Sequence, residues 1–116
     1  SNPGTNDDSD TFEIYTLDTI TVTNPDSIDS WETGTTQSIT WTSTGSITDV
    51  KIELYNVSIL EGVIVASTPN NGSYSWTIPT YLVDGTDYQI RISDASNPGT
   101  YNDSDTFEIF APDITV

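Results

Sequence analysis

The acidic side chains are the residues best suited to chemistry, and their pattern suits a hard cation. Asp outnumbers Glu by 13 to 5. Asp103-Ser104-Asp105 places two carboxylates on one side of an extended chain, and Asp8-Ser9-Asp10 repeats the arrangement. Calcium takes about six to eight oxygen ligands, so these residues predict a calcium site, although no stretch has EF-hand spacing and a solvated acidic surface is the alternative. The candidate ligands are Asp94, Asp103, Asp105, Asp8, Asp10, Asp18 and Asp113.

The sequence lacks the usual bases of nucleophilic catalysis. It contains no His and no Cys, so a Ser or Thr nucleophile would have only carboxylates or Lys51 as a base. Lys51 lies in an alternating stretch and is expected on a solvated face. Paired carboxylates can hydrolyse glycosides, but these acids fall in expected turns with no aromatic-walled cleft indicated. We therefore expect no enzymatic activity and no cofactor other than calcium.

The charge balance limits the partners of the chain. Eighteen acids face two bases, which gives a net charge of −16. Phosphates and anionic membrane surfaces could not be neutralised, so nucleic acid is excluded as a partner. No apolar run approaches the roughly 18 residues of a spanning helix, and the first residues lack the features of a signal peptide. We expect the chain to derive from a longer precursor with any signal or anchor elsewhere.

Three Asn-x-Ser sequences match the pattern for N-glycosylation: Asn56-Val57-Ser58, Asn71-Gly72-Ser73 and Asn102-Asp103-Ser104. Asn71 lies in an expected turn and is the strongest candidate. Ser and Thr make up about 30% of the chain, so such matches are also common by composition. Outward hydroxyls could carry O-linked sugar.

The chain repeats one segment near its two ends. Residues 1–15 and 96–110 are identical at twelve of fifteen positions, with an offset of 95. One strand position in a fold cannot hold both copies, so one copy is expected to belong to a neighbouring module. We predict that residues 1–17 are the last strand of a preceding repeat plus a link, 18–110 a module, and 111–116 the link and start of the next repeat. Exchange of the strand between molecules and an unpaired tail are the alternatives.

Alternation of apolar and polar residues with a period of two dominates the sequence, and no segment shows helical spacing. Turn residues separate seven expected strands at intervals near 12 residues, which is typical of sandwiches. The fold class is therefore all-β, a seven-stranded immunoglobulin/fibronectin-like β-sandwich. The expected strands span residues 19–24, 37–43, 49–56, 62–67, 73–78, 87–94 and 105–110.

Several aromatic residues are expected in the core of this sandwich. The stretch from Tyr81 to Ile92 resembles the tyrosine corner of fibronectin-type domains, in which a Tyr at the start of the sixth strand, here Tyr88, bonds to the backbone of the preceding crossover. Trp41 and Trp76 alternate with polar residues and are expected inside. Trp31 lies in a loop-like stretch, and we expect it to cover the core.

Ile20-Thr21-Val22-Thr23-Asn24-Pro25, Trp31-Glu32-Thr33-Gly34 and the stretch from Ser38 to Gly45 together resemble the Ser-Thr-rich, Kre/Knh-type Ig-like domain. The resemblance continues to about residue 110. It implies a secreted Ig-like module of cell-wall and surface proteins, often in tandem copies, and it implies no catalytic residues.

The sequence thus predicts a non-catalytic structural repeat of an extracellular filament, stalk or surface protein. Its expected partners are neighbouring copies of the same module, joined end to end and with strand exchange as an option. The alternative is an adhesin or carbohydrate-binding module that contacts cell-surface glycans, which requires exposed aromatic residues. The candidates are Trp31, Tyr55, Tyr81 and Tyr101. A non-catalytic appendage of a secreted hydrolase is a third reading.

Overall fold

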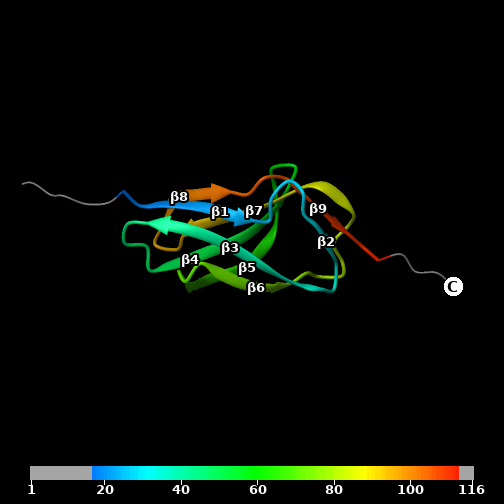
Figure 1. Ribbon diagram of the computed structural model, residues 1–116, viewed down its shortest axis with the longest axis horizontal. Coiled ribbons are helices and arrows are strands. Elements are labelled where there is room, and N and C mark those ends of the chain that lie inside the picture. Colours follow the sequence, from blue (N-terminus) through cyan, green and yellow to red (C-terminus); the bar gives the residue numbers. More distant parts are fainter. Residues whose placement is uncertain (1–16, 113–116) are drawn as a thin grey trace, which may run out of the picture.

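Alternating apolar residues organise the described part of the chain, residues 17–112 of a computed structural model, into strands joined by turns (Figure 1). This part contains nine strands and no helix, so it offers no helix that could cross a membrane. The strands are β1 (Thr19–Asn24), β2 (Ser30–Glu32), β3 (Thr36–Thr44), β4 (Asp49–Asn56), β5 (Ile59–Pro69), β6 (Ser73–Thr77), β7 (Gly85–Asp94), β8 (Asn97–Asp103) and β9 (Phe107–Phe110).

The strands form two sheets that face each other across one core. The smaller sheet has the order β1-β3-β6, and the larger has the order β2-β9-β7-β4-β5, with β8 also paired to β7. All pairs are antiparallel except β2 with β9, which is parallel. The chain changes sheets between β1 and β2. The prediction of an all-β, immunoglobulin-like sandwich is confirmed.

All seven expected strands are present, and the structure adds two, β2 and β8, that the alternation of apolar and polar residues does not predict. β2 has three residues, and β8 contains a Pro-Gly pair that is typical of turns. β2 lies against β9, which is distant in sequence, whereas β8 forms a hairpin with β7, the strand that precedes it. Their extended conformation therefore comes from pairing with those partners.

The core lies between the sheets and is built by the inward residues of each strand. Trp31 is 4% exposed and packs edge-on against Trp76 and tilted on Phe107, with ring centroids 6.3 and 5.0 Å apart. Trp41 is also buried, and its indole nitrogen donates to Asn70 Oδ1 at 2.7 Å. The expectation that Trp31 covers the core is confirmed. Its position depends on the pairing of β2 with β9, which turns the side chain inward.

The tyrosine corner has the predicted form. Tyr88 is fully buried at the start of β7, and its hydroxyl donates to the carbonyl oxygen of Val83 at 2.7 Å. Burial raises the pKa of Tyr88, and the nearby carboxylates of Glu61 and Asp84 raise it further. The bond holds the connection between β6 and β7 against the start of β7.

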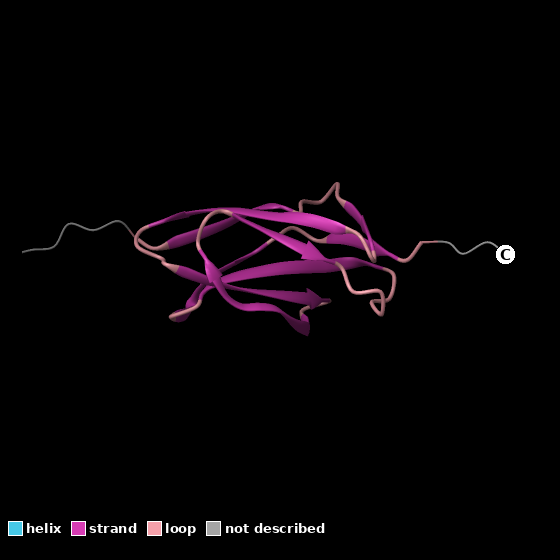
Figure 2. Cartoon of the chain, turned by 90° about the horizontal axis from the view of Figure 1, so that it is seen from below, coloured by secondary structure: helices cyan, strands magenta, loops and turns pink. Residues whose placement is uncertain are grey.

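β8 and β9 occupy successive stretches of one edge of β7. β8 pairs with the end of β7 at Arg91–Asp94, and β9 pairs with its beginning at Gly85–Tyr88. Figures 1 and 2 show the module elongated along this direction, with β1 starting near one end and β9 finishing near the other. The described ends, Leu17 and Pro112, therefore lie at opposite poles.

Candidate functional site

Arg91 organises the outer face of the larger sheet. Its guanidinium lies over the rings of Tyr55 and Tyr101, 4.5 and 4.1 Å from their centroids. Its Nε and Nη2 donate to Asp103 Oδ1 and Oδ2 at 2.7 and 3.1 Å. The hydrogen bond to Asp103 raises the pKa of Arg91 above its already high ordinary value. These contacts join β4, β7 and β8 on one face.

The candidate calcium ligands do not gather in the described part of the chain. Asp103 uses both carboxylate oxygens on Arg91. Asp94 is buried and accepts from the backbone nitrogen of Ser96 at 2.9 Å, while Asp105 is exposed. Asp18 accepts from the Ser46 nitrogen at 3.0 Å. Within residues 17–112 no three acidic side chains lie close enough together to hold a metal ion.

Asp8, Asp10 and Asp113, the other candidate ligands, lie outside the described residues. Calcium binding therefore stays a prediction. A comparison of thermal unfolding with calcium and with a chelator tests it, and an unchanged melting temperature would contradict it.

The three glycosylation candidates occupy different settings. Asn71 is exposed in the turn before β6, where its Oδ1 accepts from the Ser73 nitrogen at 3.3 Å. Asn56 is half-buried at the end of β4. Asn102 is half-buried, and its Oδ1 accepts from the Val22 nitrogen at 2.8 Å, which joins β8 to β1. Asn71 remains the strongest candidate because it is exposed, and modification stays a prediction.

The candidate binding aromatics differ in exposure. Trp31 belongs to the core, and Tyr55 is half-buried against Arg91. Tyr101 is 48% exposed but also stacks on Arg91. Tyr81 is 79% exposed and follows β6. Tyr81 lies on a hollowed surface.

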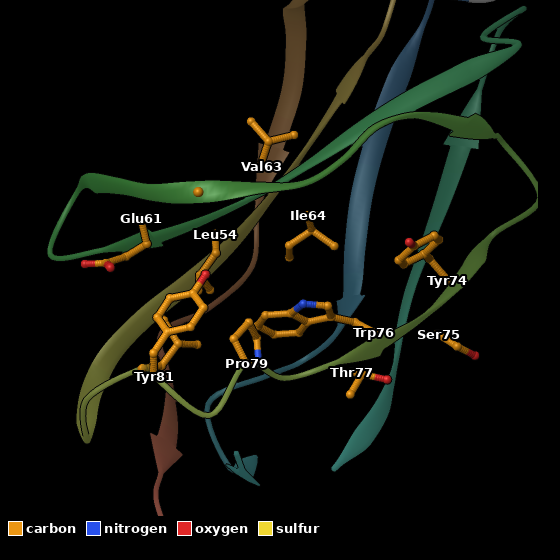
Figure 3. A pocket seen from close by; sticks show the side chains of 12 residues that line it. Leu54, Glu61, Val63, Ile64, Tyr74, Ser75, Trp76, Thr77, Pro79 and Tyr81 are labelled. Atoms are coloured by element: carbon orange, nitrogen blue, oxygen red, sulfur yellow. The ribbon is translucent and has the colours of Figure 1, made fainter. Parts of the chain in front are cut away.

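That surface is a groove of about 370 Å³ between β5 and β6, the outer strands of the two sheets (Figure 3). Figure 3 shows the side chains of Ile64 and Trp76 between the two strands, with Pro79 beside the indole. The ring of Tyr81 and the carboxylate of Glu61 lie at one end. A groove with aromatic walls, lined by both polar and apolar groups, can hold a small ligand.

The sequence does not predict this groove, because Trp76 is expected inside the core and no cleft is indicated beside it. Trp76 is buried, but Tyr74 is half-buried and lines the groove. The available signal was Tyr81, an aromatic residue in a turn next to an aromatic strand. Its position opposite β5 depends on the packing of the two sheets.

Hydrogen bonds secure the chain at both poles of the module. At the first pole, the carbonyl oxygen of Leu17 accepts from Thr44 Oγ1 at 2.6 Å, and Asp18 accepts from Ser46 as described. At the second pole, the Thr33 nitrogen donates to the Phe110 oxygen at 2.9 Å, and the Ala111 nitrogen donates to Asp84 Oδ1 at 2.7 Å. The chain is thus held to within a residue of each described end.

Comparison with protein families identifies the module. The family model described as the Kre9/KNH-like N-terminal Ig-like domain matches residues 24–109. The chain belongs to this family. The match runs from the end of β1 into β9 and confirms the resemblance drawn from the sequence. Searches of curated proteins and of solved structures gave no match.

Kre9/KNH-like domains form a structural fold family of cell-wall and secreted proteins. The chain therefore carries a cell-wall or surface-protein domain. The family match contains no assignment of catalytic residues. The absence of enzymatic activity stays a prediction, based on the lack of His and Cys.

Proposed function

We propose that this Kre9/KNH-like domain is a non-catalytic structural repeat of an extracellular filament, stalk or surface protein, joined head to tail to like modules. The observation that carries the proposal is the duplicated segment, identical at twelve of fifteen positions, in a module whose described ends lie at opposite poles. Copies joined through such ends extend along one axis, whereas ends at one pole would fold each copy back beside the last.

The junction in such an array has little slack. The offset of 95 makes Asp113 the counterpart of Asp18. Asp18 accepts a hydrogen bond from Ser46 at the start of this module, and Asp84 accepts one from Ala111 at its end. If Asp113 makes the same bond in the next module, Pro112 is the only residue between the two anchored positions. Proline restricts its own φ and the conformation of the residue before it. A stiff junction favours a rod over a string of loosely tethered modules.

Three covalently joined copies provide the test of this proposal. Electron microscopy and small-angle scattering are expected to show a straight rod with a repeat of about 45 Å, the length of residues 97–110 at about 3.3 Å per residue. The matched control carries a flexible Gly-Ser stretch after Ala111, and it should bend at each junction. Equal flexibility of the two arrays would contradict the proposal.

A second candidate function is supported by the groove between β5 and β6. Aromatic rings that border a trough suit the apolar faces of sugars, so the alternative is a carbohydrate-binding module of a surface protein. Trp76 borders the groove and serves as a fluorescence probe for soluble oligosaccharides. Binding that Tyr81→Ala weakens and Tyr81→Phe retains would support this function. No fluorescence change across the oligosaccharides would contradict it.

A further inference from the structure

Residues 103–110, here called the closing segment, contain β9 and complete the larger sheet between β2 and β7. Phe107 and Ile109 are buried, and the Phe107 ring packs on Trp31 and Tyr88 with centroids 5.0 and 6.4 Å apart. Loss of either side chain would open the core between β2 and β7. The closing segment is therefore needed for the sandwich to be complete.

Polar contacts place the closing segment in one register. Ser104 is buried, and its backbone nitrogen donates to the Ile90 oxygen at 2.8 Å. Its hydroxyl accepts from the Ile90 nitrogen at 3.0 Å and donates to the Asp105 oxygen at 2.8 Å. Asp103 pairs with Arg91, and Glu108 accepts from the hydroxyl of Ser30. A strand with a different sequence would leave several of these groups unpaired.

The same side chains recur in the N-terminal copy, defined as residues 8–15. Residues 8–14 are identical to residues 103–109. Tyr15 replaces Phe110, which is only half-buried and contributes its backbone oxygen to the bond with Thr33. The N-terminal copy therefore carries every side chain by which residues 103–109 are held.

The two copies differ just before this stretch. Asn6 stands in place of Tyr101, and Asp7 in place of Asn102. The N-terminal copy thus lacks the ring that stacks on Arg91 and the amide that accepts from β1. A molecule's own β8–β9 edge has both, and it is tethered to β7 by a two-residue turn, so it outcompetes the copy.

Chain length prevents the N-terminal copy from closing its own module. In the register of the closing segment, Tyr15 would occupy the place of Phe110, at the pole opposite the start of β1. Three residues, 16–18, join Tyr15 to Thr19, and they span at most about 14 Å. The β8–β9 edge is about 45 Å long at about 3.3 Å per residue. Only the open edge of another module is within reach.

We propose that residues 8–15 are a donor strand that completes a second copy of this chain when that copy's closing segment is displaced. The donated strand takes the place of β9 between β2 and β7, and the donor's own β1 then begins at the pole where the acceptor's β9 ends. This junction has the head-to-tail order of the covalent array, formed without a covalent bond. The proposal goes beyond that array and does not depend on it.

The test uses the full chain with its own closing segment disabled. In the Phe107→Asp variant we expect folded, concentration-dependent oligomers by light scattering, with masses at multiples of 12.6 kDa, while the unmodified chain stays single. The matched control Phe12→Asp, which leaves β9 intact, should remain a single folded chain. The double variant should lose both the oligomers and the near-ultraviolet circular dichroism signal of the packed tryptophans.

A synthetic peptide of residues 1–16, added to the double variant, should restore the signal and form a one-to-one complex. The Phe12→Asp peptide should not, and an Asn6→Tyr, Asp7→Asn peptide should bind more tightly than the unmodified one. A single-chain mass for Phe107→Asp, oligomers that persist in the double variant, or equal effects of the three peptides would overturn the proposal. The rod formed by covalent copies, whose closing segments are intact, is unaffected by these outcomes.

Discussion

Removal of the Tyr88 hydroxyl is the sharpest test of what stabilises the connection between β6 and β7. In Tyr88→Phe the buried ring keeps its place against Phe107, and only the bond to the Val83 carbonyl oxygen is lost. The change therefore isolates one hydrogen bond from the packing around it.

The size of the effect depends on what happens to the abandoned carbonyl group. A buried, unpaired acceptor costs about 1–3 kcal/mol, whereas an acceptor that water can reach costs less. Val83 is exposed, so its carbonyl group can be hydrated after a small movement of the crossover. We expect a loss of about 1 kcal/mol in the free energy of unfolding, which lowers the melting temperature by about 4–8 °C for a domain of this size.

Urea unfolding followed by tryptophan fluorescence, together with calorimetry, measures this loss. Tyr81→Phe is the matched control, because it removes the same hydroxyl from an exposed side chain and should stay within about 0.5 kcal/mol of the unmodified domain. Equal losses in the two variants, or no loss in Tyr88→Phe, would refute the reasoning that the corner bond stabilises the crossover.

Three other predictions concern the same domain. The pKa of Tyr88 in the folded domain is raised from its ordinary value of 10.0. The resulting contribution to stability is complete below pH 10 and is lost as the pH rises through the pKa of the folded state. Tyr88→Phe should therefore flatten the decline in the free energy of unfolding at alkaline pH. Arg91→Lys keeps the charge but loses the bidentate pair and the stacking, and we expect a loss of about 1 kcal/mol by urea unfolding, with Lys51→Arg within about 0.5 kcal/mol as the control. Gly45→Ala should cost about 1–3 kcal/mol, because φ is +86° and a Cβ would lie 2.8 Å from the Cα of Asp18. Gly62→Ala, where a Cβ meets nothing within 4 Å, is the neutral comparison by thermal unfolding.

Most of the strands that the sequence predicted have a buried face of their own, although β5 contains only exposed and half-buried residues. β4 and β7 alternate Val50, Ile52, Ile90 and Ile92 toward the core, and the period-two pattern reports that burial directly. β8 could not be predicted in this way, because it presents no buried apolar residue and contains a Pro-Gly pair. Its pairing with β7 outweighs that local preference.

The candidate sites were harder to predict than the strands. The pattern of two aspartates near Asp103 indicates oxygen ligands, but the sequence does not say that Arg91 lies opposite and occupies both oxygens of Asp103. The groove beside Tyr81 was missed for the same reason, since it exists only where the outer strands of two sheets face each other.

By itself, the sequence determined the sandwich class, the tyrosine corner and the duplicated closing strand, because periodicity, a local turn and a direct repeat are properties of neighbouring positions along the chain. Only the tertiary structure decided which residues meet across strands. It placed Trp31 against Phe107, paired Arg91 with Asp103, and set Leu17 and Pro112 at opposite poles. Those outcomes depend on register and sheet packing, which join residues far apart in sequence and leave no local pattern by which to recognise them.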